Sequence, residues 1–306
     1  PALTDFTFME EKKGKLFVNS PNALDGNIAS KCDTAAAKFQ SEETGLVDGV
    51  GTEADILAQI RALVGMLPAN NEDEAYTECT DNLNRACPDL ANCAGDTGIL
   101  LSQISDNGVV FETKKNYAKD MVTAFIRLNG ATVGAVANRS EIYGTDGTLE
   151  ETFDGTLSAK GAKKAAAFVK FCDAFGIPVL TITNVKGFKA TKCSEKFMAQ
   201  NAAELTYAFA DATVPKVNVV VGQAYGSAYL AMNSKSIGAD MVFAWPNAEI
   251  GMMDAKAAAK IMYADEDLAT INEKAAEYAT LQNNVTSAAR RGYVDTIIEP
   301  EDTRKY

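Results

Sequence analysis

The sequence 218-NVVVGQAYGSAYLAMNSKS-236 joins an apolar, strand-like run to a pattern of small residues that is typical of a closely packed helix. The joint contains Gly222-x-x-x-Gly226, a spacing found where a strand turns sharply into a helix and presents a serine nucleophile. In this chain the nucleophile's position holds Ala224. The turn would still offer its backbone N–H groups, which have no acceptor within the helix and carry a partial positive charge.

The N–H groups near Gly226, Ser227 and Ala228 predict an oxyanion hole, which stabilises an enolate and needs no protein nucleophile. The alternative, which the local sequence leaves open, is that the small residues only allow a helix to pack closely on a sheet. The chain contains no histidine, which excludes the usual catalytic triads and histidine bases. Glu249 and Asp254 remain candidate bases, although helix capping or ion pairing is the commoner role of such residues.

The charge balance and the cysteines exclude several classes of protein. The 306 residues carry a net charge of −12, from 29 basic and 41 acidic side chains, which argues against a nucleic-acid binder. Six cysteines without a C-x-x-C pair, in a chain without histidine, argue against a metal site. We expect reduced thiols, a cytoplasmic protein and no membrane span, because no apolar run approaches about 18 residues.

One basic cluster lies in this acidic chain. Lys186, Lys189, Lys192 and Lys196 all fall within KGFKATKCSEK. They are candidate contacts for an anionic ligand, and the alternative is that they form a solvated loop. An anionic partner would therefore be met by local charge and not by the charge of the whole protein.

Hydrophobic periodicity predicts an α/β fold in which strands alternate with helices. Asn129-Gly130 predicts a tight hairpin, because both turn positions require positive φ. Thr52-x-x-Asp55 predicts the capped start of a helix over 53–66, and the overlapping GVGTEA fits a dinucleotide motif only nominally. Strands are predicted at 121–128, 131–137, 178–183, 216–221 and 241–245, and further helices at 158–175, 194–211, 226–235 and 254–263.

Two parts of the chain resemble each other. The segments 5-DFTFM-9, 21-PNA-23 and 45-GLVDGVGTEADI-56 recur in the same order as 239-ADMVFAW-245, 246-PNA-248 and 292-GYVDTIIEPED-302. The shared order predicts an internal duplication. Between the copies, residues 68–98 are acidic and irregular, which predicts an interdomain linker. Since the turn GQAYGSA precedes the second copy, we expect an equivalent turn to precede Pro1, outside this chain.

Four segments together resemble the biotin-dependent acyl-CoA carboxyltransferases, a family that includes propionyl-CoA and acetyl-CoA carboxylase β subunits, the large transcarboxylase subunit and methylmalonyl-CoA decarboxylase α subunits. The segments are LSAKGAKKAAAFVKFCDAFGIPVLTITNVKGF, TVPKVNVVVGQAYGSAY, WPNAEIGMM and RRGYVDTIIEPEDTR. The resemblance implies crotonase-like ββα-superhelix domains. Residues 1–67 would be the tail of an N-terminal, acyl-CoA-side domain, 68–98 the acidic linker, and 99–306 a C-terminal, biotin-side domain.

The resemblance also implies a function. The family moves carboxylate between carboxybiotin, held covalently on a carrier protein, and the α-carbon of a small acyl-CoA, with an oxyanion hole in each domain and no metal in this chain. Implied partners are the biotin carboxyl carrier, biotin carboxylase or membrane decarboxylase subunits, and further copies of the chain in a dimer-based hexamer. The alternatives are the decarboxylase α subunit of a sodium-pumping complex and a non-catalytic docking subunit.

Carried over by motif, the amides of Ser227 and Ala228 would bind the ureido oxygen of biotin, and Tyr225 and Gly226 would shape that wall. Gly187 and Phe188 would line the biotin pocket, and Lys186, Lys189 and Lys192 would meet negative charge on coenzyme A or the carrier. The chain departs from the family at Ser227, where glycine is usual, and at Lys186, where proline is usual. With one expected hole lying before Pro1, we expect residues 1–306 alone to be unable to transfer carboxylate.

Overall fold

The computed structural model of the protein describes residues 1–306, except for the side chains of Ile28 and Ala29. Its centre is a mixed sheet with the strand order β12-β10-β9-β8-β5-β4-β3, to which β11 adds by pairing with β9. These strands are β3 (Val110–Thr113), β4 (Met121–Leu128), β5 (Ala131–Asn138), β8 (Val179–Val185), β9 (Lys216–Tyr225), β10 (Met241–Ala244), β11 (Glu249–Gly251) and β12 (Thr296–Ile297). Two smaller pairs are β1 (Phe8–Glu10) with β2 (Gly49–Gly51), and β6 (Glu141–Tyr143) with β7 (Leu149–Thr152).

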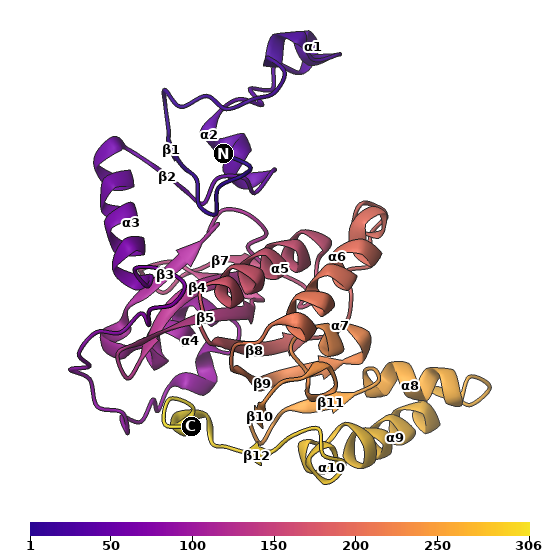
Figure 1. Cartoon of the computed structure of the whole chain (residues 1–306). Coiled ribbons are helices and arrows are strands. Elements are labelled where there is room, and N and C mark those ends of the chain that lie inside the picture. Colours follow the sequence, from indigo (N-terminus) through magenta and orange to yellow (C-terminus); the bar gives the residue numbers. More distant parts are fainter.

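Helices cover both faces of the central sheet (Figure 1). The α-helices are α1 (Asn27–Ser30), α2 (Ala37–Glu42), α3 (Glu53–Met66), α4 (Thr97–Ile104), α5 (Ala159–Ala174), α6 (Lys192–Asp211), α7 (Gly226–Ala231), α8 (Ala255–Met262), α9 (Leu268–Tyr278) and α10 (Val285–Arg290). Met121 and Phe125 of β4 share a core with α5, whereas Val122 and Ile126 share a second core with α4. The period-2 alternation of the strand thus feeds both layers.

Most of the predicted elements are confirmed. The hairpin turn has positive φ at Asn129 (53°) and Gly130 (81°), between β4 and β5. Thr52 and Asp55 form a capping box at the start of α3. The predicted small-residue face of α5 is buried, and Cys172 within it packs so closely on the neighbouring strand that a Cβ at Gly134 would lie 2.4 Å from its sulfur.

The predicted boundaries at the β9–α7 joint were wrong. The strand predicted for 216–221 runs on to Tyr225, and the helix predicted for 226–235 ends at Ala231. Ala224 is therefore a strand residue, fully buried and paired with Val185 and Ile250, and not the apex of a turn. The sequence reading missed this because β11, which pairs with the second half of β9, is only three residues long.

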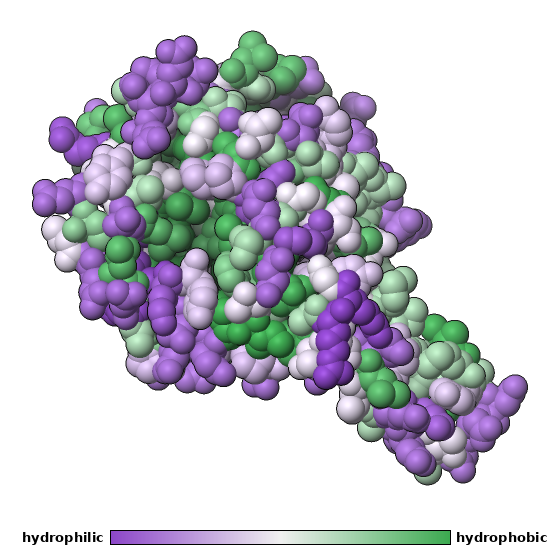
Figure 2. Space-filling model, turned by 60° about the horizontal axis from the view of Figure 1, so that its bottom comes forward, coloured by the Kyte–Doolittle hydropathy of each residue, from purple (hydrophilic) through white to green (hydrophobic). Residues whose placement is uncertain are grey.

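A helical arm formed by α8 and α9 extends from the sheet at the right of Figure 1. It exposes several large apolar side chains, including Ile261, Met262 and Leu268. Seen from below, apolar side chains also gather in a hollow of the main body (Figure 2). On the α4 side of the sheet, an apolar pocket of about 150 Å³ is lined by residues of several strands, among them Val133, Leu180 and Val219.

The internal duplication is visible in the structure. Strand β1 pairs in parallel with β2, with Phe8 opposite Gly49, and β10 pairs in parallel with β12, with Phe243 opposite Thr296. The matched positions are those that the two sequence copies align. Each pair is also held by an aspartate just before its second strand, whose carboxylate accepts a backbone hydrogen bond from the beginning of the first strand. The donors are Thr7, just before β1, and Val242, the second residue of β10.

Those two aspartates are Asp48 and Asp295. The amide of Thr7 donates to Asp48 at 2.9 Å, and the amide of Val242 donates to Asp295 at 2.8 Å. The backbone of each aspartate returns a hydrogen bond, at 2.8 Å in both copies, to the carbonyl of the same residue. One local solution therefore occurs twice in the chain, which supports the duplicated fold class.

The acidic segment 68–98 is attached to the body by a buried arginine. Arg304 is only 7% exposed, and its guanidinium donates to the carboxylate of Asp106 at 2.6 Å and to the carbonyls of Ile104 and Asn82 at 2.5 and 3.2 Å. Asp106 also accepts hydrogen bonds from the backbone of the β4–β5 hairpin. The C-terminal turn, the acidic segment and the hairpin thus share one charged centre.

We expect Arg304→Met to lower the free energy of unfolding by about 3–5 kcal/mol, because it leaves the buried carboxylate of Asp106 without its charged partner. Urea unfolding measures this change. Arg61→Met, at an exposed position on α3, is the matched control and should change stability by less than about 0.5 kcal/mol. A loss at Arg304 as small as that of the control would contradict the role assigned to this arginine.

Candidate active site

The candidate site lies where β9 ends and α7 begins. Gly226 is the first residue of α7 and has a φ of 60°, a left-handed conformation that side-chain-bearing residues rarely adopt. A Cβ at this position would also lie 3.0 Å from the carbonyl oxygen of Met252. Glycine is therefore required twice here, for the backbone angle and for the close approach of the loop that follows β11.

The start of α7 is open. No side chain caps it, and the N–H groups of Ser227 and Ala228 have no acceptor within a helix at these positions. Ser227 is exposed, whereas Ala228 is buried on the sheet. Two adjacent main-chain donors at a turn of this kind can stabilise a developing negative charge on oxygen.

A pocket of about 350 Å³ adjoins this turn. Gly226 and Ser227 form one wall, Gly251 and Met252 another, and Tyr229 and Tyr293 add aromatic surface. The hydroxyl of Tyr229 is buried and has no hydrogen-bond partner among the described residues. Burial raises the pKa of Tyr229 to about 12, so the phenol stays protonated at neutral pH. The pocket therefore combines main-chain donors with a largely apolar lining, to which Arg291 adds a positive charge.

The two carboxylates considered as bases have other partners. Glu249 in β11 forms a short hydrogen bond with the hydroxyl of Tyr225, and burial together with this carboxylate raises the pKa of Tyr225 well above its usual range. Asp254 accepts a hydrogen bond from the amide of Ala257 at 3.1 Å and so caps α8. Capping, the alternative reading of Asp254, is confirmed.

The biotin-pocket residues expected from the family resemblance lie at the same edge of the sheet. Val185 at the end of β8 pairs with Ala224, so the following Gly187 and Phe188 leave the sheet beside the end of β9. Gly187 has a φ of 150°, and Phe188 packs partly against the core. Neither residue lines the pocket beside α7.

The lysine cluster lies on the surface after β8. Lys186 and Lys192 are exposed and Lys189 is half-buried. Within the described part of the chain, none of Lys186, Lys189, Lys192 and Lys196 forms an ion pair with a carboxylate. Their charges are therefore free to meet an anionic ligand. Lys192 and Lys196 lie in the first turns of α6, so the alternative of a solvated loop applies only to Lys186 and Lys189.

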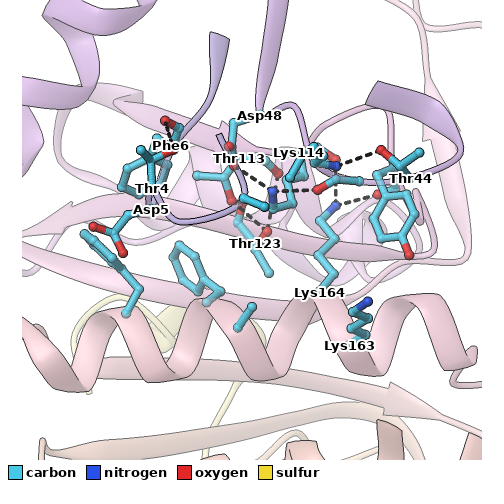
Figure 3. Close-up of a pocket in the computed structure, with 17 residues that line it drawn as sticks. Thr4, Asp5, Phe6, Thr44, Asp48, Thr113, Lys114, Thr123, Lys163 and Lys164 are labelled. Carbon is cyan, nitrogen blue, oxygen red and sulfur yellow. Dashed lines mark hydrogen bonds and ion pairs between the residues drawn. The ribbon is translucent and has the colours of Figure 1, made fainter. Parts of the chain in front are cut away.

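A second pocket, of about 390 Å³, lies between α5 and the first residues of the chain (Figure 3). Lys164 enters it from α5 and is only 2% exposed. Its ammonium group donates to the carbonyls of Lys114, Tyr117 and Met121 at 3.0, 2.9 and 2.7 Å. Burial lowers the pKa of Lys164 to about 7, but all its N–H groups already have acceptors.

Two further charged groups of this second pocket, Asp48 and Lys114, are also engaged by the chain. Asp48 forms an ion pair with Lys114 at 3.3 Å, and Lys114 also donates to the carbonyl of Gly45 at 2.7 Å. Burial raises the pKa of Asp48. Because these groups bind each other, we interpret the cluster as a structural joint and place the candidate active site at the β9–α7 turn.

Sequence reasoning missed Asn283. It lies in a π-helical turn, Ala279–Asn283, and is fully buried. Its amide donates to the carbonyl of Met253 at 3.0 Å, and a Cβ at Gly251 would lie 2.2 Å from its side-chain oxygen. Asn283 thus holds the loop after β11, whose other side faces Gly226. No local sequence pattern marks a π-turn, so Asn283 could not be singled out from the sequence.

Two further findings concern metal ions and membranes. Among the described residues, no group of three histidine, cysteine, aspartate or glutamate side chains is arranged to hold a metal ion. No helix in the described chain is both long enough and apolar enough to cross a membrane.

Comparison with known proteins gives the family. The carboxyl transferase domain matches residues 1–306. The chain is 37% identical to a putative propionyl-CoA carboxylase β chain of Bacillus subtilis, covering 99% of this chain and 61% of that protein. It is 34% identical to the methylmalonyl-CoA decarboxylase α subunit of Veillonella parvula, covering 99% of this chain and 60% of that protein.

Comparison of the fold with solved structures indicates the same family. A crystal structure of transcarboxylase 12S, a hexamer with hydrolysed methylmalonyl-coenzyme A bound, matches with a TM-score of 0.88 and 34% identity, over 100% of this chain and 60% of that one. The protein thus spans about three-fifths of the length of these relatives. Its sequence matches the carboxyl transferase domain, and its α/β, crotonase-like fold matches that of transcarboxylase 12S. The chain belongs to the carboxyl transferase domain family.

Proposed function

We propose that this protein transfers a carboxyl group between biotin, held on a carrier protein, and the α-carbon of a small acyl-CoA thioester. The observation that carries the proposal is the uncapped β9–α7 turn, with Gly226 at positive φ, in a chain that matches the carboxyl transferase domain throughout. The named relatives act on propionyl-CoA and methylmalonyl-CoA, which makes a short branched or unbranched acyl group the expected substrate.

The residues at the turn fit a neutral ureido group. The amides of Ser227 and Ala228 would donate to the ureido oxygen, and Gly226 leaves room for it to approach. Tyr225, held by Glu249, would support this wall. When bound, carboxybiotin would supply the carboxyl group and its ureido nitrogen could take up the substrate proton. The chain would then contribute donors and position, which agrees with the lack of histidine.

The remaining assignments are proposals of the same kind. Gly187 and Phe188 would line the side of the biotin pocket that faces the end of β8. Residues 1–67 would belong to an acyl-CoA-side domain and 99–306 to the biotin-side domain, an arrangement supported by the repeated β-pair and its aspartate. Biotin carrier and carboxylase subunits, further copies of the chain and a cytoplasmic location stay predictions.

The reverse reaction is the second candidate. Two of the similar curated proteins are methylmalonyl-CoA decarboxylase α subunits, at 34% and 35% identity. Carboxylation and decarboxylation place the same negative charge on the same oxygens, so the same main-chain donors would serve both directions. Direction would then be decided by the partner subunits.

The first test separates backbone donors from side chains at the turn. Ser227→Ala should keep most of the transfer activity, because its amide remains. Ala228→Pro removes an amide and should lower the rate by about 10²–10³-fold. Ala228→Gly, which keeps the amide, is the matched control. The assay is biotin-dependent carboxyl transfer or release with malonyl-CoA or methylmalonyl-CoA, in the assembled enzyme containing this chain. A folded Ser227→Ala variant without activity would refute main-chain catalysis. If the assembled enzyme is inactive even with the unmutated chain, the result would favour a non-catalytic docking subunit.

The second test concerns the lysines after β8. Replacing Lys189 and Lys192 by alanine should raise the apparent KM of acyl-CoA or carrier protein and flatten its dependence on salt, with kcat little changed. Lys256→Ala together with Lys260→Ala, on the α8 arm, removes the same charge elsewhere. Equal effects of the two pairs, or none at low salt, would show that Lys189 and Lys192 are only solvated surface charges.

A further inference from the structure

The ladder between β8 and β9 is interrupted just before the candidate site. The two strands pair residue by residue from Val179 and Lys216 to Thr183 and Val220, and pairing resumes with Val185 opposite Ala224. One residue of β8, Asn184, therefore lies opposite three of β9, residues 221–223. This bulge adds two residues to β9 shortly before it reaches Gly226, and bulges often re-aim a strand beside an active site.

The side chain of Asn184 fills the bulge. Its oxygen accepts a hydrogen bond from the backbone amide of Gln223 at 3.0 Å. The backbone N–H of Asn184 donates to the side-chain oxygen of Asn138 at 3.2 Å. A Cβ at Gly222 would lie 2.6 Å from the Asn184 oxygen and 2.9 Å from its Cγ. Gly222 is thus required because Asn184 occupies the space where a side chain would lie.

The bond to Gln223 determines where β9 goes next. From Gln223 onward, β9 changes its partner from β10 to β11, with Gln223, Ala224 and Tyr225 opposite Glu249, Ile250 and Gly251. A shift of one residue in this register would turn each N–H and side chain of the segment to the opposite side. Asn184 supplies an acceptor for the N–H of Gln223, which stabilises the observed register of the bulged segment relative to a register shifted by one residue.

We propose that Asn184 is a positioning residue, which holds the bulge of β9 so that the amides of Ser227 and Ala228 point into the pocket beside α7. Asn184 does not line that pocket, and it acts through Gln223 and the strand that follows. Its effect on reaction rate rests on the proposed carboxyl transfer, whereas its effect on the geometry of the turn does not.

The first measurement is hydrogen exchange of peptides covering 222–232, in Asn184→Ala, Asn184→Leu and Asn184→Asp. Alanine and leucine remove the acceptor, so exchange there should become faster by at least about tenfold while the rest of the sheet stays protected. Aspartate keeps an acceptor oxygen and should restore protection. Asn201→Ala is the matched control, since its side chain also makes one bond to a backbone group, Ala159 O at 2.8 Å, between α5 and α6.

The second measurement is kinetic. In Asn184→Ala, kcat/KM for the biotin substrate should fall about 10²-fold, as expected for a misplacement near 1 Å, with KM for acyl-CoA unchanged. Asn184→Asp should recover most of the activity. Gly222→Ala should reproduce the loss, yet add little in the Asn184→Ala background, because the collision partner is then gone.

Unchanged exchange over 222–232 in the alanine and leucine variants, or an aspartate variant as impaired as alanine, would overturn the proposal. If exchange changes as expected but the assembled enzyme containing the unmutated chain transfers no carboxyl group, the positioning role stands and the proposed function fails. If the enzyme is active and Asn184→Ala keeps its kcat/KM, the positioning role fails alone.

Discussion

The fold depends on β9, a strand whose backbone hydrogen bonds go to different neighbouring strands along its length. β9 lies between β8 and β10 over its first half, and between β8 and β11 over its second half. Backbone N–H and C=O groups inside a sheet need partners, so a strand buried on both edges can change neighbour only where something else supplies the bonds. That change of neighbour carries β9 past the edge of the regular sheet and ends it at Gly226.

The same constraint explains why the site is made from backbone. The first helical turn at the carboxyl edge of a parallel sheet offers N–H groups that have no acceptor within the helix. A chain with a net charge of −12 and no histidine has few side chains suited to stabilise an oxyanion at this position. Main-chain donors need no protonation state to be set, and the neighbouring phenols of Tyr225 and Tyr229 stay neutral because burial raises the pKa of each.

The repeated aspartate shows how a duplicated unit adapts to its surroundings. Asp48 and Asp295 make the same two backbone contacts, yet their electrostatics differ. Lys235 lowers the pKa of Asp295 through a direct bond, whereas burial beneath α5 raises the pKa of Asp48 despite Lys114. Both copies thus have the same backbone contacts, whereas the pKa of the aspartate is set by the different residues packed around each copy.

Local sequence determined the elements whose cause is local. Asn129-Gly130 requires the hairpin because both residues adopt positive φ, the Thr52–Asp55 box starts α3, and alternation along β4 assigns its two faces. The glycine spacing and the family motifs placed Ser227 and Ala228 at the β9–α7 turn. Tertiary structure decided where β9 ends, why Ala224 is buried, and that Asn184 and Asn283 support the turn from β8 and from a π-turn. Those contacts join residues 30–40 positions apart, and a bulge or a three-residue strand such as β11 becomes stable only when its partner is already in place.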